Sequence, residues 1–160
     1  MKLITSFIQI LIMTYQEKKA ILSIVSTLLI FGGYTFYVFV LNMEESLAKL
    51  NDSYFWGKFI LVLIPVSIIA QIIITIIFTI INKMATDEDM PSFSDELDKL
   101  IELKSMRIGY VIFIFGFLAA MTTQVLHMEL YTMFVALISS GFIASVVDEL
   151  AKLYYYRQGV

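Results

Sequence analysis

The sequence predicts an all-α integral membrane protein folded as a four-helix bundle, and two observations lead to this prediction. The 160 residues are 59% hydrophobic with a mean hydropathy of +0.85, well above the ~45–50% apolar content of soluble domains. Four apolar runs lack Lys, Arg, Asp, Glu and His, at residues 20–41, 59–81, 108–126 and 130–147. As α-helices they are about 27–35 Å long, which matches the ~30 Å hydrocarbon core of a bilayer. A backbone in lipid must satisfy its own polar groups, so we expect each run to span as a helix.

The segment before the first run is expected to form an amphipathic helix at the membrane interface, over about residues 2–16. Polar residues from Lys2 to Gln16 recur at helical spacing, and apolar residues fill the opposite side. A signal peptide fits less well, because no small-residue cleavage site follows. The alternative left open is one continuous helix over residues 2–41.

The basic residues predict the orientation of the chain. Of the 11 Lys and Arg residues, nine lie in residues 1–19, 82–107 and 148–160, and two lie in residues 42–58. The positive-inside rule therefore places both termini, the loop 82–107 and the tail 148–160 in the cytoplasm. With about half of the chain in four spans, the sequence predicts a single membrane domain over residues 1–160.

The loop 82–107 is expected to hold a polar connector followed by an amphipathic helix that runs directly into the third span. Ser92 or Ser94 is a suitable cap for this helix, with acidic residues in its first turn. The loop has a net charge of −3, so it is not expected to bind anionic headgroups. The candidate residues for a cytoplasmic interaction are Asp95, Lys99, Glu102 and Arg107.

Polar residues inside the runs are candidates for contacts between helices. The second run has a stripe at three- and four-residue spacing, formed by Ser67, Gln71, Thr75 and Thr79. Hydrogen bonding between helices, at ~0.6–2 kcal/mol per contact, is the favoured interpretation, and a pore lining in an oligomer is the alternative. The interhelical polar candidates are Gln71, Thr75 and Gln124.

Small residues predict where helix backbones approach each other, since in lipid no hydrophobic force joins the helices. They recur at four-residue intervals in the third and fourth runs. The helix-packing candidates are Gly116, Ala120, Ala136, Ser140 and Ala144.

The sequence offers little for catalysis or metal binding. The chain has no Cys and one His, so thiolate chemistry, Cys-ligated metals and the usual nucleophile–base pairs cannot be assembled within one chain. His127 and Glu129 are two residues apart and do not share a helix face, so a solvated turn explains them better than a metal site. We therefore expect no enzyme activity, no catalytic, cofactor-binding or metal-binding residues, and no nucleic-acid partner.

Two segments carry a resemblance to a known family. The stretch from Asp95 to Arg107, running into a span, and the segment from Lys152 to Arg157 resemble a family of small predicted membrane proteins of unknown function from Gram-positive bacteria. Members often have Arg where this chain has Leu97. The resemblance covers the second half of the chain and implies a bacterial cytoplasmic (plasma) membrane, without an assigned activity.

These observations favour a non-enzymatic membrane protein that acts through protein or lipid interaction, as an accessory, immunity or stress-response component. The rival interpretation is a small channel or transporter subunit formed by oligomerisation. The absence of charge inside the runs favours the first, since transporters and proton relays use such groups. The partners considered are the lipid bilayer, a second copy of the chain, and a membrane or cytoplasmic protein.

Overall fold

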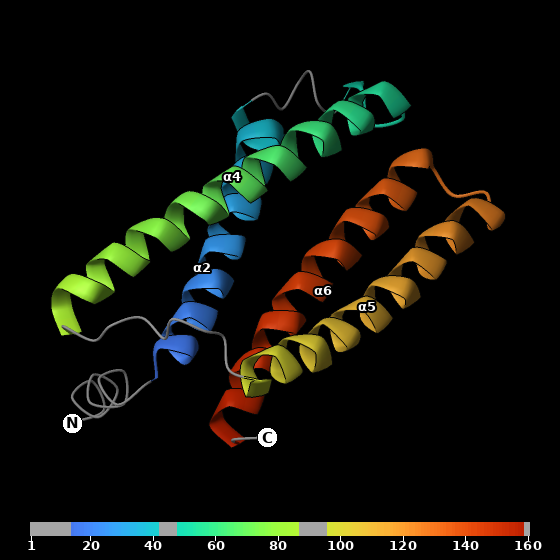
Figure 1. Ribbon diagram of the computed structural model, residues 1–160. Helices are drawn as coiled ribbons and strands as arrows, with labels where there is room; N and C mark the ends of the chain where they lie inside the picture. The colour runs from blue at the N-terminus through green and yellow to red at the C-terminus, as the bar shows by residue number, and fades with distance from the viewer. Residues whose placement is uncertain (1–13, 42–47, 87–95, 159–160) are drawn as a thin grey trace, which may run out of the picture.

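The fold is all-helical, as expected. The structure is a computed structural model and describes residues 14–41, 48–86 and 96–158. Its described part has four helices long and apolar enough to cross a membrane, which are those of a multi-pass membrane protein. The elements shown in Figure 1 are α2 (Tyr15–Phe36), the π-helical turn η1 (Tyr37–Leu41), α4 (Ser53–Thr86), α5 (Glu96–Val125) and α6 (Leu130–Gln158).

The expected interfacial helix over residues 2–16 is not supported. Residues 2–13 lie outside the described part, and Tyr15 and Gln16 already belong to α2. Thr14 is the N-cap of α2, with extended backbone angles (φ −63°, ψ 158°), and it forms a capping box with Glu17. The Glu17 carboxylate accepts from the Thr14 backbone N–H at 2.8 Å, and the Glu17 N–H donates to Thr14 Oγ1 at 3.3 Å. The alternative of one continuous helix over residues 2–41 is wrong, because Thr14 has an extended backbone and α2 begins at Tyr15.

The helices extend beyond the apolar runs of the sequence. The amphipathic segment and the third span are one helix, α5, as expected, although Ser92, Ser94 and Asp95 lie outside the described residues. The helix of the fourth run continues past residue 147, through most of the expected tail to Gln158. Hydropathy finds the part of a helix that lies in lipid and misses helical turns that continue into the polar region.

The helices form two antiparallel pairs, α2 with α4 and α5 with α6, and α2 also packs on α6 (Figure 1). We call the end where α2 and α5 begin and α4 and α6 finish the charged end. The opposite end, where η1 finishes and α4 begins, is called the aromatic end. There Trp56 is 2% exposed and stacks on Phe134 of α6, with ring centroids 5.6 Å apart. Its indole N–H donates to the Leu50 carbonyl at 2.7 Å.

Small residues join α5 to α6 over most of their length. A Cβ on Gly116 would overlap the Cβ of Ser140, and a Cβ on Gly109 would lie 3.1 Å from the Ala144 carbonyl oxygen. Ser140 and Ala144 are buried in this seam. A Cβ has no room at Gly116 and would be tightly packed at Gly109, so the two backbones approach closely there.

The turn between α5 and α6 closes by a Schellman motif. His127 N–H donates to the Gln124 carbonyl at 3.1 Å, and Met128 N–H donates to the Thr123 carbonyl at 3.0 Å. His127 has φ 54°, the left-handed conformation that this motif requires and that glycine adopts most easily. The exposed His127 is thus a turn residue, as the solvated-turn interpretation holds.

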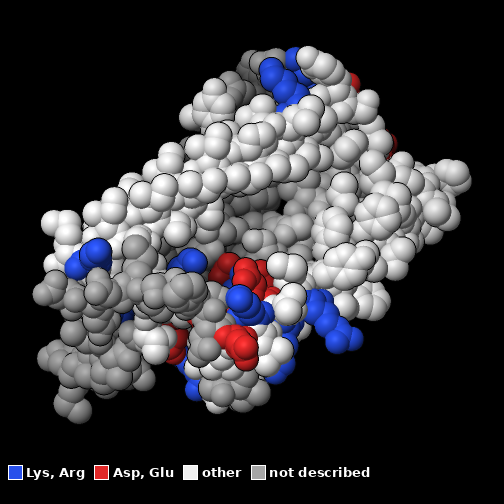
Figure 2. Space-filling view, viewed as in Figure 1, with Lys and Arg blue, Asp and Glu red and all other residues white. Residues whose placement is uncertain are grey.

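The side of the bundle between α4 and α5 stays open. Within the described residues, α4 and α5 share no packed interface, and α4 touches α6 sparsely. Because α2 holds α4 on one side and α6 holds α5 on the other, a gap remains between the two pairs. Figure 2 shows this gap as a hollow beneath α4, with Asp and Glu side chains at its edge toward the charged end.

Candidate functional site: a lateral groove with a charged end

The gap between the helix pairs contains a groove of about 720 Å³. This volume lies within the ~300–1,000 Å³ that small-molecule sites occupy. Side chains of α2, α4 and α6 line it, and α5 contributes Phe113. Most of the lining is apolar, with residues such as Ile30, Phe31, Leu63, Leu137 and Phe142.

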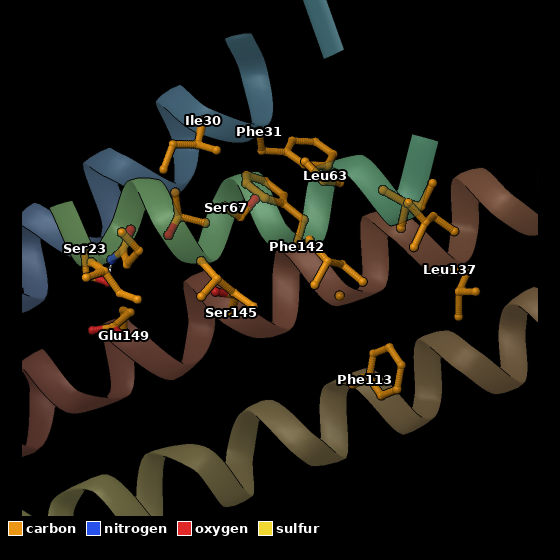
Figure 3. A pocket seen from close by; sticks show the side chains of 18 residues that line it. Ser23, Ile30, Phe31, Leu63, Ser67, Phe113, Leu137, Phe142, Ser145 and Glu149 are labelled. Atoms are coloured by element: carbon orange, nitrogen blue, oxygen red, sulfur yellow. Dashed lines mark hydrogen bonds between the residues drawn. The ribbon is translucent and has the colours of Figure 1, made fainter. Parts of the chain in front are cut away.

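The groove is polar at one end. Figure 3 shows Ser23 and Glu149 close together at that end, Ser145 beside them, and Leu137 toward the other end. From Leu137 to Glu149 the groove follows twelve residues of α6, which is about 18 Å of helix. A ring stack of Phe31 on Phe142, with centroids 4.3 Å apart, joins α2 to α6 along its wall.

The polar end leads into a smaller chamber of about 360 Å³ at the charged end. Ser23, Gln71 and Glu149 line both the groove and the chamber, so the two spaces adjoin. The chamber adds charged side chains from three helices, which are Lys19, Asp98, Glu102 and Lys152. An apolar groove therefore ends in a charged chamber.

The polar stripe of the second span faces α2 of the same chain. Gln71 Nε2 donates to Ser23 Oγ at 2.7 Å, and the Thr79 and Tyr15 hydroxyls are hydrogen-bonded at 3.0 Å. Thr75 Oγ1 donates to the carbonyl of Gln71 in its own helix at 2.8 Å, and within the described residues this candidate has no bond to another helix. Ser67 lines the groove.

Asp98 joins α2, α5 and α6 at the chamber wall. Its carboxylate accepts from Gln16 Nε2 at 3.0 Å and is hydrogen-bonded by the Tyr156 hydroxyl. Tyr156 lies on α6 beyond the apolar run, and burial, with Asp98 next and then Glu102 and Glu149, raises its pKa to about 12. The carboxylates of Asp98, Glu102 and Glu149 therefore all lie near the Tyr156 hydroxyl.

Lys152 is held by two carboxylates of its own helix. Its Nζ lies 3.0 Å from Asp148 Oδ2 and 3.0 Å from Glu149 Oε1. The chamber is lined by three carboxylates, Asp98, Glu102 and Glu149, and by the ammonium groups of Lys19 and Lys152, which gives a formal net charge of −1. The chamber is acidic overall, and the Lys152 charge is already neutralised.

Contacts of charged side chains join α2 and α5 to α6 near the chamber. Glu17, which caps α2, also lies 3.4 Å from Arg157 Nε on α6. Lys104 of α5 lies over the Tyr155 ring at 5.6 Å from its centroid, a distance at which a cation and a ring attract. These contacts hold the charged ends of α2, α5 and α6 around the chamber.

The remaining sequence candidates divide between the α5–α6 seam and the surface. Gly116, Ala120, Ser140 and Ala144 lie in or beside the seam, while Ala136 is half-buried. Gln124 Nε2 is buried without a hydrogen-bond partner among the described residues, so its interhelical bond is not seen. Of the cytoplasmic interaction candidates, Glu102 lines the chamber, Lys99 and Arg107 are exposed, and Asp95 lies outside the described residues.

The sequence interpretation missed Glu149 as a groove residue. It treated the tail from residue 148 as outside the span and as a surface. The signal was present, since Ile138, Phe142, Ser145 and Glu149 follow one another at three- and four-residue spacing and share one face of a helix. Extending that periodicity past Val147 places a carboxylate at the end of an apolar groove.

The described residues include no group of three or more His, Cys, Asp and Glu side chains arranged to hold a metal ion. Comparison of the chain with protein-family models, curated proteins and solved structures finds no match. The groove and chamber are therefore interpreted from the chemistry of this chain alone.

Proposed function

We propose that this chain is a non-enzymatic integral membrane protein that acts by binding, and that the lateral groove takes up the acyl chain of a membrane lipid. One observation carries the proposal. The groove of about 720 Å³ opens between α4 and the α5–α6 pair, where the bundle lacks a helix interface. A cavity open to the side of a membrane bundle faces lipid, and an apolar lining makes it a favourable place for a hydrocarbon chain.

The test is lipid retention by the purified protein, measured by native mass spectrometry after solubilisation in mild detergent. Ser145→Phe places a ring at the polar end of the groove, so we expect it to lose the lipid that the wild type retains. Ile143→Phe adds the same ring on an exposed position of α6 that does not line the groove. This control should retain lipid like the wild type. Equal retention by both variants and the wild type would contradict the proposal.

The alternative function, a channel or transporter subunit formed by oligomerisation, has less support. A pore built from several copies needs the polar stripe to face a neighbouring copy. Gln71 and Thr79 instead bond α2 of the same chain. An ion leak through liposomes that disappears in Gln71→Leu would favour the channel.

The membrane in which the protein lies, its orientation and its partners are part of the same proposal. The positive-inside rule supports cytoplasmic termini, and the family resemblance supports a bacterial plasma membrane. A membrane or cytoplasmic protein partner fits the exposed Lys99 and Arg107 at the charged end.

The native chain has no Cys, so single cysteines report its orientation cleanly. Ser53→Cys should react with a membrane-impermeant thiol reagent in intact cells. Lys99→Cys should react only after lysis. The reverse pattern would invert the orientation.

A further inference from the structure

The charged chamber limits which lipid headgroup the groove accepts. This argument rests on the proposed function, because it concerns the lipid whose chain enters the groove. The apolar part follows about 18 Å of α6, and one leaflet supplies half of the ~30 Å hydrocarbon core, about 15 Å. A chain from the leaflet at the charged end fills the groove and leaves its headgroup at the chamber.

The groove wall suits a hydrocarbon chain better than a partner helix or a second copy of α4. A helix is about 10 Å across with its side chains and packs closely on small residues in a membrane, whereas this wall holds large side chains such as Ile30, Phe31 and Leu63. A single hydrocarbon chain is thinner and adapts to a curved wall. The second chain of the same lipid remains in the bilayer, because the groove is open to the side.

The chamber has acceptors for an ammonium group. Asp98 accepts from Gln16 and Tyr156, which are neutral donors, and an ionised carboxylate has about four acceptor positions. Glu102 has an exposed side chain and no ion-pair partner among the described residues. Both carboxylates therefore have acceptor positions to spare.

The chamber also has one cation for a phosphate. Lys152 is taken up by Asp148 and Glu149, whereas Lys19 lines the chamber from α2. A phosphate beside Lys19 of α2 and an ammonium beside Asp98 and Glu102 of α5 each meet a group of opposite charge. A headgroup with a negative charge alone meets a chamber with a formal net charge of −1 and is disfavoured.

We propose that the groove and chamber bind a zwitterionic glycerophospholipid whose headgroup ends in a primary ammonium, of the phosphoethanolamine type. Its three N–H donors make charge-assisted hydrogen bonds to the carboxylates. A phosphocholine lipid has the same charges and lacks these donors, so it binds more weakly. A phosphoglycerol lipid lacks the cation altogether and binds least.

The test measures thermal unfolding of the delipidated protein in detergent, through the fluorescence of Trp56, the one tryptophan of the chain. Dioleoyl phosphoethanolamine, phosphocholine and phosphoglycerol lipids are added in turn. At a concentration ~100-fold above its Kd, the ammonium lipid should raise the midpoint by about 5–10 °C. The other two should raise it less, in the order given.

Glu102→Gln removes one carboxylate without changing the length of the side chain. Because Glu102 is exposed, the fold is expected to persist. The variant should bind the phosphoethanolamine lipid about tenfold more weakly, and it should reduce the difference between this lipid and the phosphocholine lipid. Glu129→Gln is the matched control, because it removes one negative charge at the aromatic end.

Four outcomes would overturn the proposal. Equal shifts of the unfolding midpoint for all three lipids, all abolished by Ser145→Phe, would support lipid binding in the groove and refute selection of the headgroup. A largest shift for the phosphoglycerol lipid would refute it too. No shift with any lipid would refute the proposed function as well. A lipid-free dimer in native mass spectra that Ser145→Phe makes monomeric would assign the groove to a second copy.

Discussion

The α5–α6 seam and the side of the bundle formed by α4, here called the α4 flank, differ in how their helices are held together. In the seam, glycine, serine and alanine let two backbones meet, and Ser140, Ala144 and Ala120 are buried there. On the flank, α4 is the most apolar of the four helices, yet it shares no packed interface with α5. It is held by hydrogen bonds such as Gln71 to Ser23 and by Trp56 at the aromatic end.

This difference shows that apolar content does not decide which membrane helices pack. Lipid chains are as apolar as isoleucine, so an isoleucine-rich surface gains little by leaving lipid for another helix. Close backbone approach and polar contacts provide the gain instead. The helix with few small residues therefore leaves room for lipid beside it, and the groove is a consequence of the composition of α4.

The largest expected effect is in the seam, at Gly116. Gly116→Ala places a Cβ where it would overlap Ser140 Cβ, so the two helices must separate. We expect a loss of about 1–3 kcal/mol of stability, measured as thermal unfolding in detergent. Gly32→Ala is the control, since nothing lies within 4 Å of a Cβ there. If both variants unfold at the same temperature, the seam is not closely packed.

The second-largest effect on stability is expected at Gln71, on the α4 flank. Gln71→Leu removes the 2.7 Å hydrogen bond to Ser23, and the free energy of unfolding should fall by about 0.6–2 kcal/mol. Ser23→Ala removes the same bond from the other side. The double variant should lose less than the sum of the single losses, because the residues share one interaction. Additive losses would mean that the two side chains do not bond each other.

The smallest effect is expected at the turn that ends the seam. His127 has φ 54°, which costs an L-residue about 1–2 kcal/mol and costs glycine little. His127→Gly should therefore leave the protein as stable as the wild type or stabilise it by about 0.5–1 kcal/mol. A marked destabilisation in thermal unfolding would show that the imidazole makes a contact that the fold needs.

The sequence predicted much of the fold and less of the site. Uninterrupted apolar runs located the four helices, because the cost of an unsatisfied backbone in lipid leaves few other structures. The boundary at Tyr15 was missed, since hydropathy does not register the capping box of Thr14 and Glu17. The missing α4–α5 interface was not predictable either, because it depends on which helices pair.

The candidate site depends on that pairing. The sequence makes Glu102 a candidate for an interaction, whereas the end of the apolar run at Val147 predicts that Glu149 lies at the surface. Asp98 and Gln16 are 82 residues apart in the chain, so no local pattern joins them. They meet only because α2 and α5 begin at the same end of the bundle.

The groove predicts unequal access of lipid to two neighbouring positions of α5. Phe113 lines the groove, while Phe115 is 69% exposed on the outer surface. A tryptophan replaces either residue in a chain carrying Trp56→Phe. The protein is placed in phosphoglycerol bilayers with an increasing fraction of phosphoethanolamine lipid that has brominated chains, which quench tryptophan fluorescence on contact.

Phe113→Trp should be quenched strongly at low fractions of the brominated lipid, and its quenching should then saturate, because the groove selects that lipid. Phe115→Trp should follow the bulk fraction of that lipid. Identical curves at the two positions would contradict the central claim and make the groove ordinary lipid-facing surface.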